Sequence, residues 1–600
     1  MEIVLMSGNE AVARGAWEAG VEVAMAYPGT PSTEILQNIA LYDDIRAEWS
    51  SNEKVALDTA IGAAYAGKRA LAAMKHVGLN VASEALFYSS YTGINAGLVI
   101  IVADDPGMHS SQNEQDSRQY ARFAKVPMLE PSDSQEAKTF VGIGLELSEE
   151  YDTPVLIRMS TRTSHSKSIV TLEERQAIEM RPYMKDVAKY VMIPGYARGR
   201  RVAIEERTTR LRQHVDEMDL NRVEMGDRSL GIISAGVTYQ YAREIFPDAS
   251  FLKLGIIWPL PEQQIRDFAA SVDKLLVVEE LDPYLEEMVV QLGIEVQGKA
   301  IFPSIGEFSP ERVRASVVRA GLLSQNGANS STMVTENVPT ISSLPSRPPL
   351  FCAGCGHRDL FWILHKLKVT VNSDIGCYAL GVLPPLDATD TLGAMGASIG
   401  VAIGMRLAGL KDRNVAVIGD STFFHSGLPA LAAAVYNRTP ITVVVVDNRT
   451  TGMTGHQGHP GSGQTLTGGQ TEPISIAAVV RAMGVHHVTE VDARNLAETE
   501  TSIRQAMAAE EPAVVVIRAI CVFESQHNRE AYKIIAEDCN GCTLCFRLGC
   551  PAILKSDELD EKSKRPKAWI DPTVCVGCGL CFDVCARQAI EIGAEKVVSV

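Results

Sequence analysis

The stretch Val415–Thr450, VAVIGDSTFFHSGLPALAAAVYNRTPITVVVVDNRT, decides the fold. It holds two apolar runs, VAVI and ITVVVV, and two residues after each run stands a polar side chain, Asp420 and then Asn448. Runs of this length predict buried strands, and the 28 residues between the two polar positions suit one strand–helix–strand crossover. We therefore expect parallel neighbouring strands with both polar side chains at the carboxyl edge of a sheet, where ligands bind.

Similar runs along the chain predict a multi-domain α/β protein. The expected strands are Val21–Tyr27, Leu98–Ala103 and Pro154–Met159, then Leu230–Ser234, Phe251–Leu254 and Lys274–Glu279, then Val415–Ile418, Ile441–Val446 and Ala513–Arg518. A charge-rich stretch at 190–228 predicts an exposed helical connector, and a Ser-, Asn- and Pro-rich stretch at 324–349 predicts a linker. The predicted domains are 1–190, 191–323 (which includes the connector), 350–525 and 530–600.

Composition excludes several classes of protein. Of 600 residues, 46% are hydrophobic and 22% charged, so the chain can build large cores and is not disordered. A net charge of −17 argues against nucleic-acid binding, which needs a basic surface. The N-terminus lacks the pattern of a signal peptide, and the least polar run, 392–410, carries Arg406 and many glycines. We expect a cytoplasmic protein without a membrane span.

Eight of the twelve cysteines lie in the last 62 residues. They are Cys539, Cys542, Cys545 and Cys550, followed by Cys575, Cys578, Cys581 and Cys585. This order resembles the two-cluster bacterial ferredoxins, in which each fourth cysteine binds the other [4Fe–4S] cluster. The resemblance implies that Cys585 joins the first triplet and Cys550 the second, although the spacer before Cys550 is one residue longer than usual. A pair of zinc knuckles is the alternative.

The segment Gly419-Asp420-Ser421, followed by Asn448, resembles the thiamine-diphosphate motif. The resemblance implies Mg2+ bound by Asp420, Asn448 and the Thr450 carbonyl, which form the hard oxygen set that Mg2+ prefers. Ser421 replaces the usual glycine. From the residues alone, Asp and Asn at strand ends are more often simple helix caps.

A glycine-rich stretch, GAMGASIG at 393–400, precedes an expected helix whose N–H groups would face the diphosphate. The full set of cofactor-binding residues implied by the resemblance is Gly376, Cys377, Gly393, Met395, Gly396, Gly419, Asp420, Ser421, Asn448, Thr450, Gly452 and Met453.

The first domain carries three further candidates. Glu53 matches the glutamate that contacts the aminopyrimidine ring of thiamine diphosphate in this superfamily, although a first-turn glutamate is usually only a partner of the helix dipole. The loop YPGTPSTE (27–34) resembles the YPITPS loop of 2-oxoacid:ferredoxin oxidoreductases, which makes Thr30 a candidate contact for the oxoacid or else a helix cap. Arg118 is a candidate clamp for the substrate carboxylate, with Arg122 as a competitor and a solvated helix face as the alternative.

The resemblance covers nearly the whole chain, in the order pyrimidine-binding domain (1–190), transketolase C-terminal-like domain (191–323), diphosphate-binding domain (350–525) and ferredoxin-like tail (530–600). The segment FCAGCGHRD at 351–359 makes the chain similar to alpha subunits of indolepyruvate ferredoxin oxidoreductases. That family implies a small beta subunit in an alpha2-beta2 assembly. It also implies coenzyme A, external ferredoxin, and oxidative decarboxylation of aryl 2-oxoacids.

Four cysteines remain outside the tail, and the resemblance implies that they bind a third, proximal cluster. They are Cys352, Cys355, Cys377 and Cys521. A redox CxxC with two buried cysteines is the alternative. Other oxoacids, a non-oxidative thiamine-diphosphate decarboxylase and an electron-transfer subunit also remain open at this point.

Overall fold

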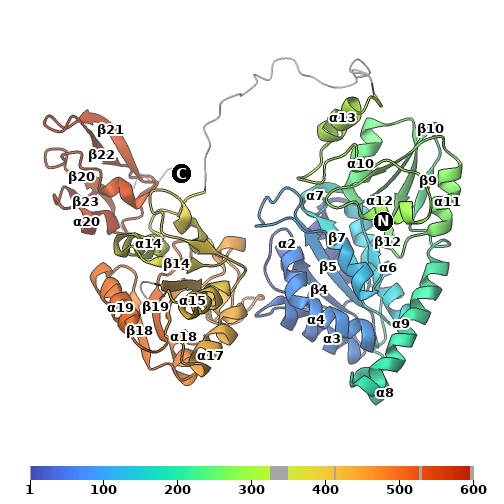
Figure 1. The fold of residues 1–600 in the computed structure, drawn as a ribbon, viewed down its shortest axis with the longest axis horizontal. Helices are drawn as coiled ribbons and strands as arrows, with labels where there is room; N and C mark the ends of the chain where they lie inside the picture. Colours follow the sequence, from blue (N-terminus) through green and yellow to red (C-terminus); the bar gives the residue numbers. More distant parts are fainter. Residues whose placement is uncertain (1, 324–348, 411–413, 526–529, 595–600) are drawn as a thin grey trace. The chain divides into compact units, whose positions relative to one another are not determined.

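The computed structural model describes residues 2–323, 349–410, 414–525 and 530–594, and the chain forms two compact units, Met1–Asn337 and Val338–Val600 (Figure 1). All of the predicted linker except Pro349 lies outside the described residues. Within the described ranges, no helix is long and apolar enough to cross a membrane.

The first unit is built on a seven-stranded sheet. Its strands, in spatial order, are β12 (Ile256–Trp258), β6 (Met128–Leu129), β7 (Val155–Ser160), β5 (Leu98–Asp104), β4 (Ala70–Lys75), β2 (Val23–Ala26) and β3 (Arg46–Trp49). Every pair is parallel except β12–β6. The three predicted strands are confirmed, while β3, β4, β6 and β12 were not predicted.

Helices cover this sheet, and two outer strands form a separate ribbon. The helices are α1 (Gly8–Glu18), α2 (Thr33–Ile39), α3 (Glu53–Tyr65), α4 (His76–Thr92), α5 (Arg118–Ala124), α6 (Ser134–Tyr151), α7 (Thr161–His165) and α8 (Val187–Tyr190). The ribbon pairs β1 (Ile3–Ser7) with β8 (Lys167–Thr171). The predicted connector is the long helix α9 (Pro194–His214), most of whose residues are solvent-accessible.

A second, smaller sheet follows α9. Its order is β13 (Leu275–Val278), β10 (Asp227–Ala235), β11 (Ala249–Leu254) and β9 (Arg222–Glu224), with α10 (Gly236–Ile245), α11 (Glu262–Ala270), α12 (Tyr284–Gln291) and α13 (Pro310–Arg319) around it. The sheet shares one apolar core with the first, because Leu57 and Ile100 belong to the same buried cluster as Leu252 and Val277. Strand β12 belongs to this second segment in sequence, but it pairs with β6 and forms the edge of the larger sheet. The two predicted domains therefore pack as one body.

The second unit holds a six-stranded parallel sheet. Its order is β15 (Thr391–Leu392), β14 (Thr370–Ser373), β16 (Asn414–Gly419), β17 (Thr442–Asp447), β19 (Ala513–Arg518) and β18 (His487–Asp492). The helices are α14 (Gly356–Leu367), α15 (Ala397–Leu407), α16 (Asp420–Thr422), α17 (Leu428–Tyr436), α18 (Ile476–Ala482) and α19 (Leu496–Ala508). Short turns of other helix types are η1 (Cys377–Val382), η2 (Phe423–Gly427) and η3 (Gly452–Thr454). Strands β16 and β17 are parallel neighbours, as predicted.

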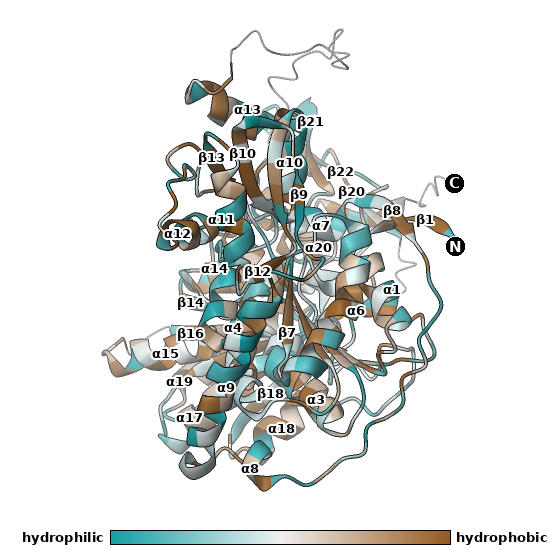
Figure 2. Ribbon diagram, turned by 90° about the vertical axis from the view of Figure 1, so that its right-hand side faces the viewer, coloured by the Kyte–Doolittle hydropathy of each residue, from teal (hydrophilic) through white to brown (hydrophobic). Residues whose placement is uncertain are grey.

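The tail adds two antiparallel ribbons, β20 (Ala531–Ile534) with β23 (Ile590–Ala594) and β21 (Ile553–Leu559) with β22 (Pro566–Ile570). Two short helices, η4 (Cys545–Leu548) and α20 (Leu580–Val584), carry cysteines. The apolar core of the tail packs against Trp362 of α14 and Leu496 of α19. All six residues of the interior strand β7 are buried; most are hydrophobic, but Arg158 and Ser160 are polar (Figure 2).

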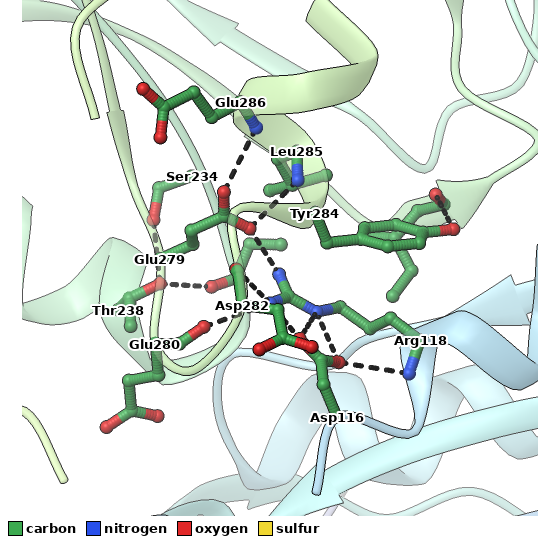
Figure 3. A network of polar contacts seen from close by, with 12 residues as sticks. Asp116, Arg118, Ser234, Thr238, Glu279, Glu280, Asp282, Tyr284, Leu285 and Glu286 are labelled. Atoms are coloured by element: carbon green, nitrogen blue, oxygen red, sulfur yellow. Dashed lines mark hydrogen bonds and ion pairs between the residues drawn. The ribbon is translucent and has the colours of Figure 1, made fainter. Parts of the chain in front are cut away.

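Arg118, the predicted substrate clamp, lies buried inside the first unit, where its guanidinium is already paired with carboxylates (Figure 3). Its guanidinium donates to Asp116 at 2.8 Å and to Glu279 at 2.6 Å, and to the carbonyls of Glu280 and Asp282. Burial alone would lower its pKa, but Asp116 and Glu279 outweigh it and hold the pKa well above its usual value. The residue therefore joins the segment before α5 to the segment after β13.

Glu279 in turn accepts the backbone N–H groups of Leu285 and Glu286, at the start of α12. Arg122, the competing candidate, is exposed on α5. We expect Arg118→Ala to destabilise the first unit by about 3 to 5 kcal/mol, because two buried carboxylates lose their counter-charge. Arg122→Ala is the matched control and should change stability by less than about 0.5 kcal/mol. Urea unfolding measures both, and normal stability of Arg118→Ala with a selectively raised KM would restore the clamp.

Candidate active site

Asp420 is the centre of the site in the second unit. It follows β16 directly, is 2% exposed, and accepts the backbone N–H groups of Asn448 at 3.0 Å and Arg449 at 2.7 Å. His459 lies 3.1 Å from the same carboxylate. Burial pushes the pKa of Asp420 up, but the facing His459 and the backbone N–H groups outweigh it and keep the pKa below its usual range. The carboxylate therefore binds the end of the neighbouring strand and does more than cap its own helix.

Asn448 and Thr450 stand beside Asp420, as predicted. Both are buried, and the Thr450 N–H faces the Asn448 side-chain oxygen at 3.3 Å. Ser421 accepts a hydrogen bond from Thr451, which fixes the start of α16 against the same loop. The Asp420 carboxylate and the Asn448 amide thus meet at one sheet edge beside Thr450, and oxygen donors of this kind fit Mg2+.

The glycine-rich loop precedes α15, as expected, with Gly396 at a positive φ of 84°. A side chain at Gly396 would strike Ser426, so only glycine fits there. However, the Ser398 N–H and hydroxyl already bind Asp374, and the Gly393 N–H binds the Ser373 carbonyl. An anion bound at this helix end would therefore share the end with Asp374. Burial raises the pKa of Asp374 to about 6.

Tyr378 packs against the backbone at Gly376 and Gly419, beside the glycine-rich loop. Its hydroxyl binds Asp374, and its ring fills the space that a side chain at Gly376 or Gly419 would need. Both glycines were predicted as cofactor contacts, and the tyrosine ring is the physical reason why each must be glycine. Tyr378, Asp374 and His459 were missed by sequence reasoning. His459 had a signal, since it lies in the glycine-rich segment HQGHPGSG at 456–463.

The four cysteines outside the tail gather at the same edge of the sheet. Cys521 follows β19, and its N–H binds the Asn448 carbonyl at 3.1 Å. Burial, together with the neighbouring Cys355, Cys521 and Cys352, raises the pKa of Cys377 to about 12. A Cβ at Gly452 would lie 3.5 Å from the Cys377 sulfur and 3.8 Å from the Asn448 amide. The cysteine group therefore adjoins the predicted Mg2+ ligands.

The tail cysteines line two cavities, in the crossed arrangement that the resemblance implied. One cavity is lined by Cys539, Cys542, Cys545 and Cys585. The other is lined by Cys550, Cys575, Cys578 and Cys581, and Cys355 is part of its wall. The longer spacer therefore does not move Cys550 away from the second triplet.

All twelve thiols are free of disulfides. In the described ranges, no three His, Cys, Asp or Glu side chains converge as they would on a single metal ion. In cubane clusters each thiolate binds a different iron, and two groups of four free cysteines are consistent with such clusters.

Glu53 and Thr30 lie in the first unit. Glu53 opens α3, is only 5% exposed, and its carboxyl packs so closely on Gly78 of α4 that a Cβ there would lie 2.7 Å away. A simple partner of the helix dipole would face solvent, so burial favours a specific role. Thr30 is half-buried and does not cap α2, which begins after Ser32. Met453 of the other unit is half exposed.

Comparisons with known proteins agree with this layout. The family "Pyruvate flavodoxin/ferredoxin oxidoreductase, thiamine diP-bdg" matches residues 14–217, and "Thiamine pyrophosphate enzyme, C-terminal TPP binding domain" matches residues 374–517. The first range includes Thr30 and Glu53, and the second includes Asp420 and Asn448.

Full-length relatives extend the match. The indolepyruvate oxidoreductase subunit IorA of Pyrococcus horikoshii is 41% identical over 98% of this chain and 97% of its own. The subunit of the same name from Thermococcus kodakarensis is 40% identical with the same coverage. A solved 2-oxoglutarate:ferredoxin oxidoreductase from Magnetococcus marinus is 20% identical, with a TM-score of 0.44, over 52% of this chain and 65% of that one. On the full-length matches, this chain belongs to the family of the indolepyruvate oxidoreductase subunit IorA.

Proposed function

We propose that this protein is the thiamine-diphosphate-dependent, iron–sulfur subunit of an enzyme that oxidatively decarboxylates indole-3-pyruvate and other aryl 2-oxoacids. In the overall reaction, one 2-oxoacid and one coenzyme A give one acyl-CoA, CO2 and a proton. The two electrons released reduce two molecules of ferredoxin. The name of its full-length relatives supports the substrate class.

One observation carries the proposal: the residues predicted to bind Mg2+ and a cysteine group lie at a single sheet edge. The position of Gly452 lies within 4 Å of both the Cys377 sulfur and the Asn448 amide. A non-oxidative decarboxylase needs no electron acceptor beside its cofactor, and a pure electron carrier needs no Mg2+ ligands. Only an enzyme that passes electrons from a thiamine cofactor to a cluster uses both.

Each residue then has a defined task. Asp420, Asn448 and the Thr450 carbonyl would hold Mg2+ and through it the diphosphate, next to Gly419 and Ser421. Thiamine diphosphate, when bound, supplies the carbanion chemistry that releases CO2 from a 2-oxoacid. Glu53 would hold a proton against the aminopyrimidine ring nitrogen, and Thr30 would contact the oxoacid.

The cysteine groups suggest an order for electron transfer. Cys355 belongs to the group beside the Mg2+ ligands and also lines the cavity of Cys550, Cys575, Cys578 and Cys581. We place that cluster second and the cluster of Cys539, Cys542, Cys545 and Cys585 last, nearest external ferredoxin. A small beta subunit, in an alpha2-beta2 assembly in the cytoplasm, would contribute to coenzyme A binding.

A substrate screen tests the function directly. With the beta subunit present, we expect kcat/KM for indole-3-pyruvate or phenylpyruvate to exceed that for pyruvate, branched-chain oxoacids and 2-oxoglutarate by at least about tenfold. The assay follows reduction of ferredoxin or a dye, which requires coenzyme A. A preference for pyruvate would assign the protein to a different substrate class.

Glu53→Gln tests the proton-holding role. Since only one protonating contact is removed, thiamine diphosphate should be retained while turnover falls by about 100-fold or more. Glu48→Gln, on the neighbouring exposed strand position, is the control and should keep normal turnover. Near-normal dye reduction by Glu53→Gln would mean that another residue has this role.

Iron content tests the three clusters. The anaerobically reconstituted protein should carry about 12 iron atoms per chain, and Cys377→Ser about eight. Cys377→Ser should retain the EPR signals of the tail clusters, whereas Cys545→Ser should lose one of them and retain the proximal signal. If Cys377→Ser keeps the iron content of the wild type, the four cysteines outside the tail are structural.

A further inference from the structure

Lys75 is the last residue of β4, at the carboxyl edge of the sheet in the first unit. It is 7% exposed, and its ammonium donates to the Ser110 carbonyl at 2.8 Å and approaches the Ser110 hydroxyl at 3.4 Å. These contacts are neutral, so a positive charge is buried beneath a surface loop without a charged partner among them. Buried charges in proteins are normally paired.

Two other buried lysines in this unit follow that rule. Lys138 contacts Glu18 at 2.5 Å, and Lys253 contacts Glu136 at 2.5 Å. For Lys75, no carboxylate in the described part of the chain lies within the 4 Å of an ion pair. Burial lowers its pKa to about 8 against the weaker opposing effect of Asp105, so the side chain remains mostly charged at neutral pH.

Asp105, the nearest opposing charge, is already engaged. Its carboxylate accepts the Ser110 N–H at 2.8 Å, the Ser111 hydroxyl at 2.6 Å and the Thr161 hydroxyl at 2.7 Å. These hydrogen bonds hold the loop that covers Lys75. They also occupy the Asp105 carboxylate with neutral donors instead of the Lys75 ammonium. Lys75 therefore keeps most of its attraction for an additional anion.

The position of Lys75 connects it to the predicted substrate loop. A Cβ at Gly29 would lie 3.2 Å from the Lys75 Cβ, and the Ser110 hydroxyl donates to the Thr30 carbonyl at 3.1 Å. The loop itself is braced, because Asn9 donates to the Pro31 carbonyl at 2.7 Å and Gly29 donates to the Thr33 hydroxyl. The braced loop at residues 29–33 and the buried Lys75 ammonium thus lie next to each other.

Lys75 is also connected to Glu53 through the first turn of α4. Lys75 is followed at once by α4, whose Gly78 packs on the Glu53 carboxyl. Thr30, Lys75 and Glu53 therefore come from neighbouring strand ends of one sheet, since β4 pairs with β2. Arg118, which sequence reasoning chose as the clamp, is buried in its own ion pairs.

We propose that Lys75 binds the carboxylate of the 2-oxoacid, which takes the place of the Ser110 carbonyl on the ammonium. This inference rests on the proposed function. A lysine binds as a point charge and makes no two-pronged contact. The carboxylate departs as neutral CO2, so the attraction is stronger before the reaction than after it. Its loss should therefore raise KM more than it lowers kcat.

The test compares Lys75→Gln and Lys75→Arg in the complete two-subunit enzyme. Lys68→Gln is the matched control, since Lys68 stands just before the other end of β4 and pairs with Glu22. We expect Lys75→Gln to raise KM for indole-3-pyruvate by about 10- to 100-fold, with kcat within about threefold. KM for coenzyme A, thiamine-diphosphate content and thermal stability should not change. Lys75→Arg should stay near wild type.

Inhibitors isolate the carboxylate. Indole-3-propionate, which cannot be decarboxylated, should lose affinity for Lys75→Gln by the same factor as the substrate, whereas indole-3-propionamide should bind both proteins equally. The assignment would be overturned by a normal KM for indole-3-pyruvate in Lys75→Gln, or by an equal rise of that KM in Lys68→Gln. It would also be overturned if Lys75→Gln lost affinity for the acid and for the amide by the same factor. A raised KM for coenzyme A or lost thiamine diphosphate would overturn it in favour of a phosphate ligand. If the wild type oxidises no 2-oxoacid, the proposed function itself fails.

Discussion

Parallel pairing of β16, β17 and β19 is the constraint on which the second unit depends. The register aligns Gly419 with Val446 and Asp447 with Arg518, so the three strands end together. Asp420 then reaches the N–H groups of Asn448 and Arg449, and Cys521 reaches the Asn448 carbonyl. A one-residue shift would turn every strand side chain to the opposite face and separate these groups. The predicted Mg2+ ligands and the cysteines thus share a location because of strand register.

The first unit depends on buried charge in a different way. Arg158 binds Asp104 at 2.7 Å and also Glu130, and Arg118 binds Asp116 and Glu279. Such networks add little net stability, because desolvation of the ions offsets their attraction, but they strongly disfavour any packing that leaves one ion unpaired. Asp104 is the last residue of β5, and Glu279 follows β13, so the network fixes the smaller sheet against the larger one.

Much of the fold followed from the sequence where hydrophobic runs were long and β-branched. Val415–Ile418 and Ile441–Val446 are strands, and 190–228 contains an exposed helix, as predicted. Strand β4 was missed because its sequence, ALAAMK, is rich in alanine, a strong helix former; the strand forms because both of its faces are buried. The pairing of β12 with the larger sheet could not be predicted either, because a strand of three residues does not show in the sequence which strand it pairs with.

The candidate site was likewise predicted from the sequence only in part. The resemblance to two-cluster ferredoxins predicted the grouping of the tail cysteines, and the expected strand order predicted the meeting of Asp420 with Asn448. The role of Arg118 as a clamp stays a prediction, and a sequence cannot show that Glu279, 161 positions away, pairs with its charge. Lys75 was overlooked for the converse reason. It ends an unrecognised strand, and a lysine without a buried partner is visible only when the fold is known.

Attachment of the tail depends on close backbone approach. Gly354 has a φ of 75°, and a Cβ there would lie 2.3 Å from Val576, beside Cys578. Arg358 donates to the Leu548 carbonyl at 2.6 Å and to the Phe351 carbonyl at 2.5 Å, so one guanidinium ties the tail to the loop that carries Cys352 and Cys355. A flexible tether would let the distance between the cysteine groups vary. Because electron transfer slows steeply with distance, a rigid contact at Gly354 and Arg358 is what a fixed relay between these groups requires.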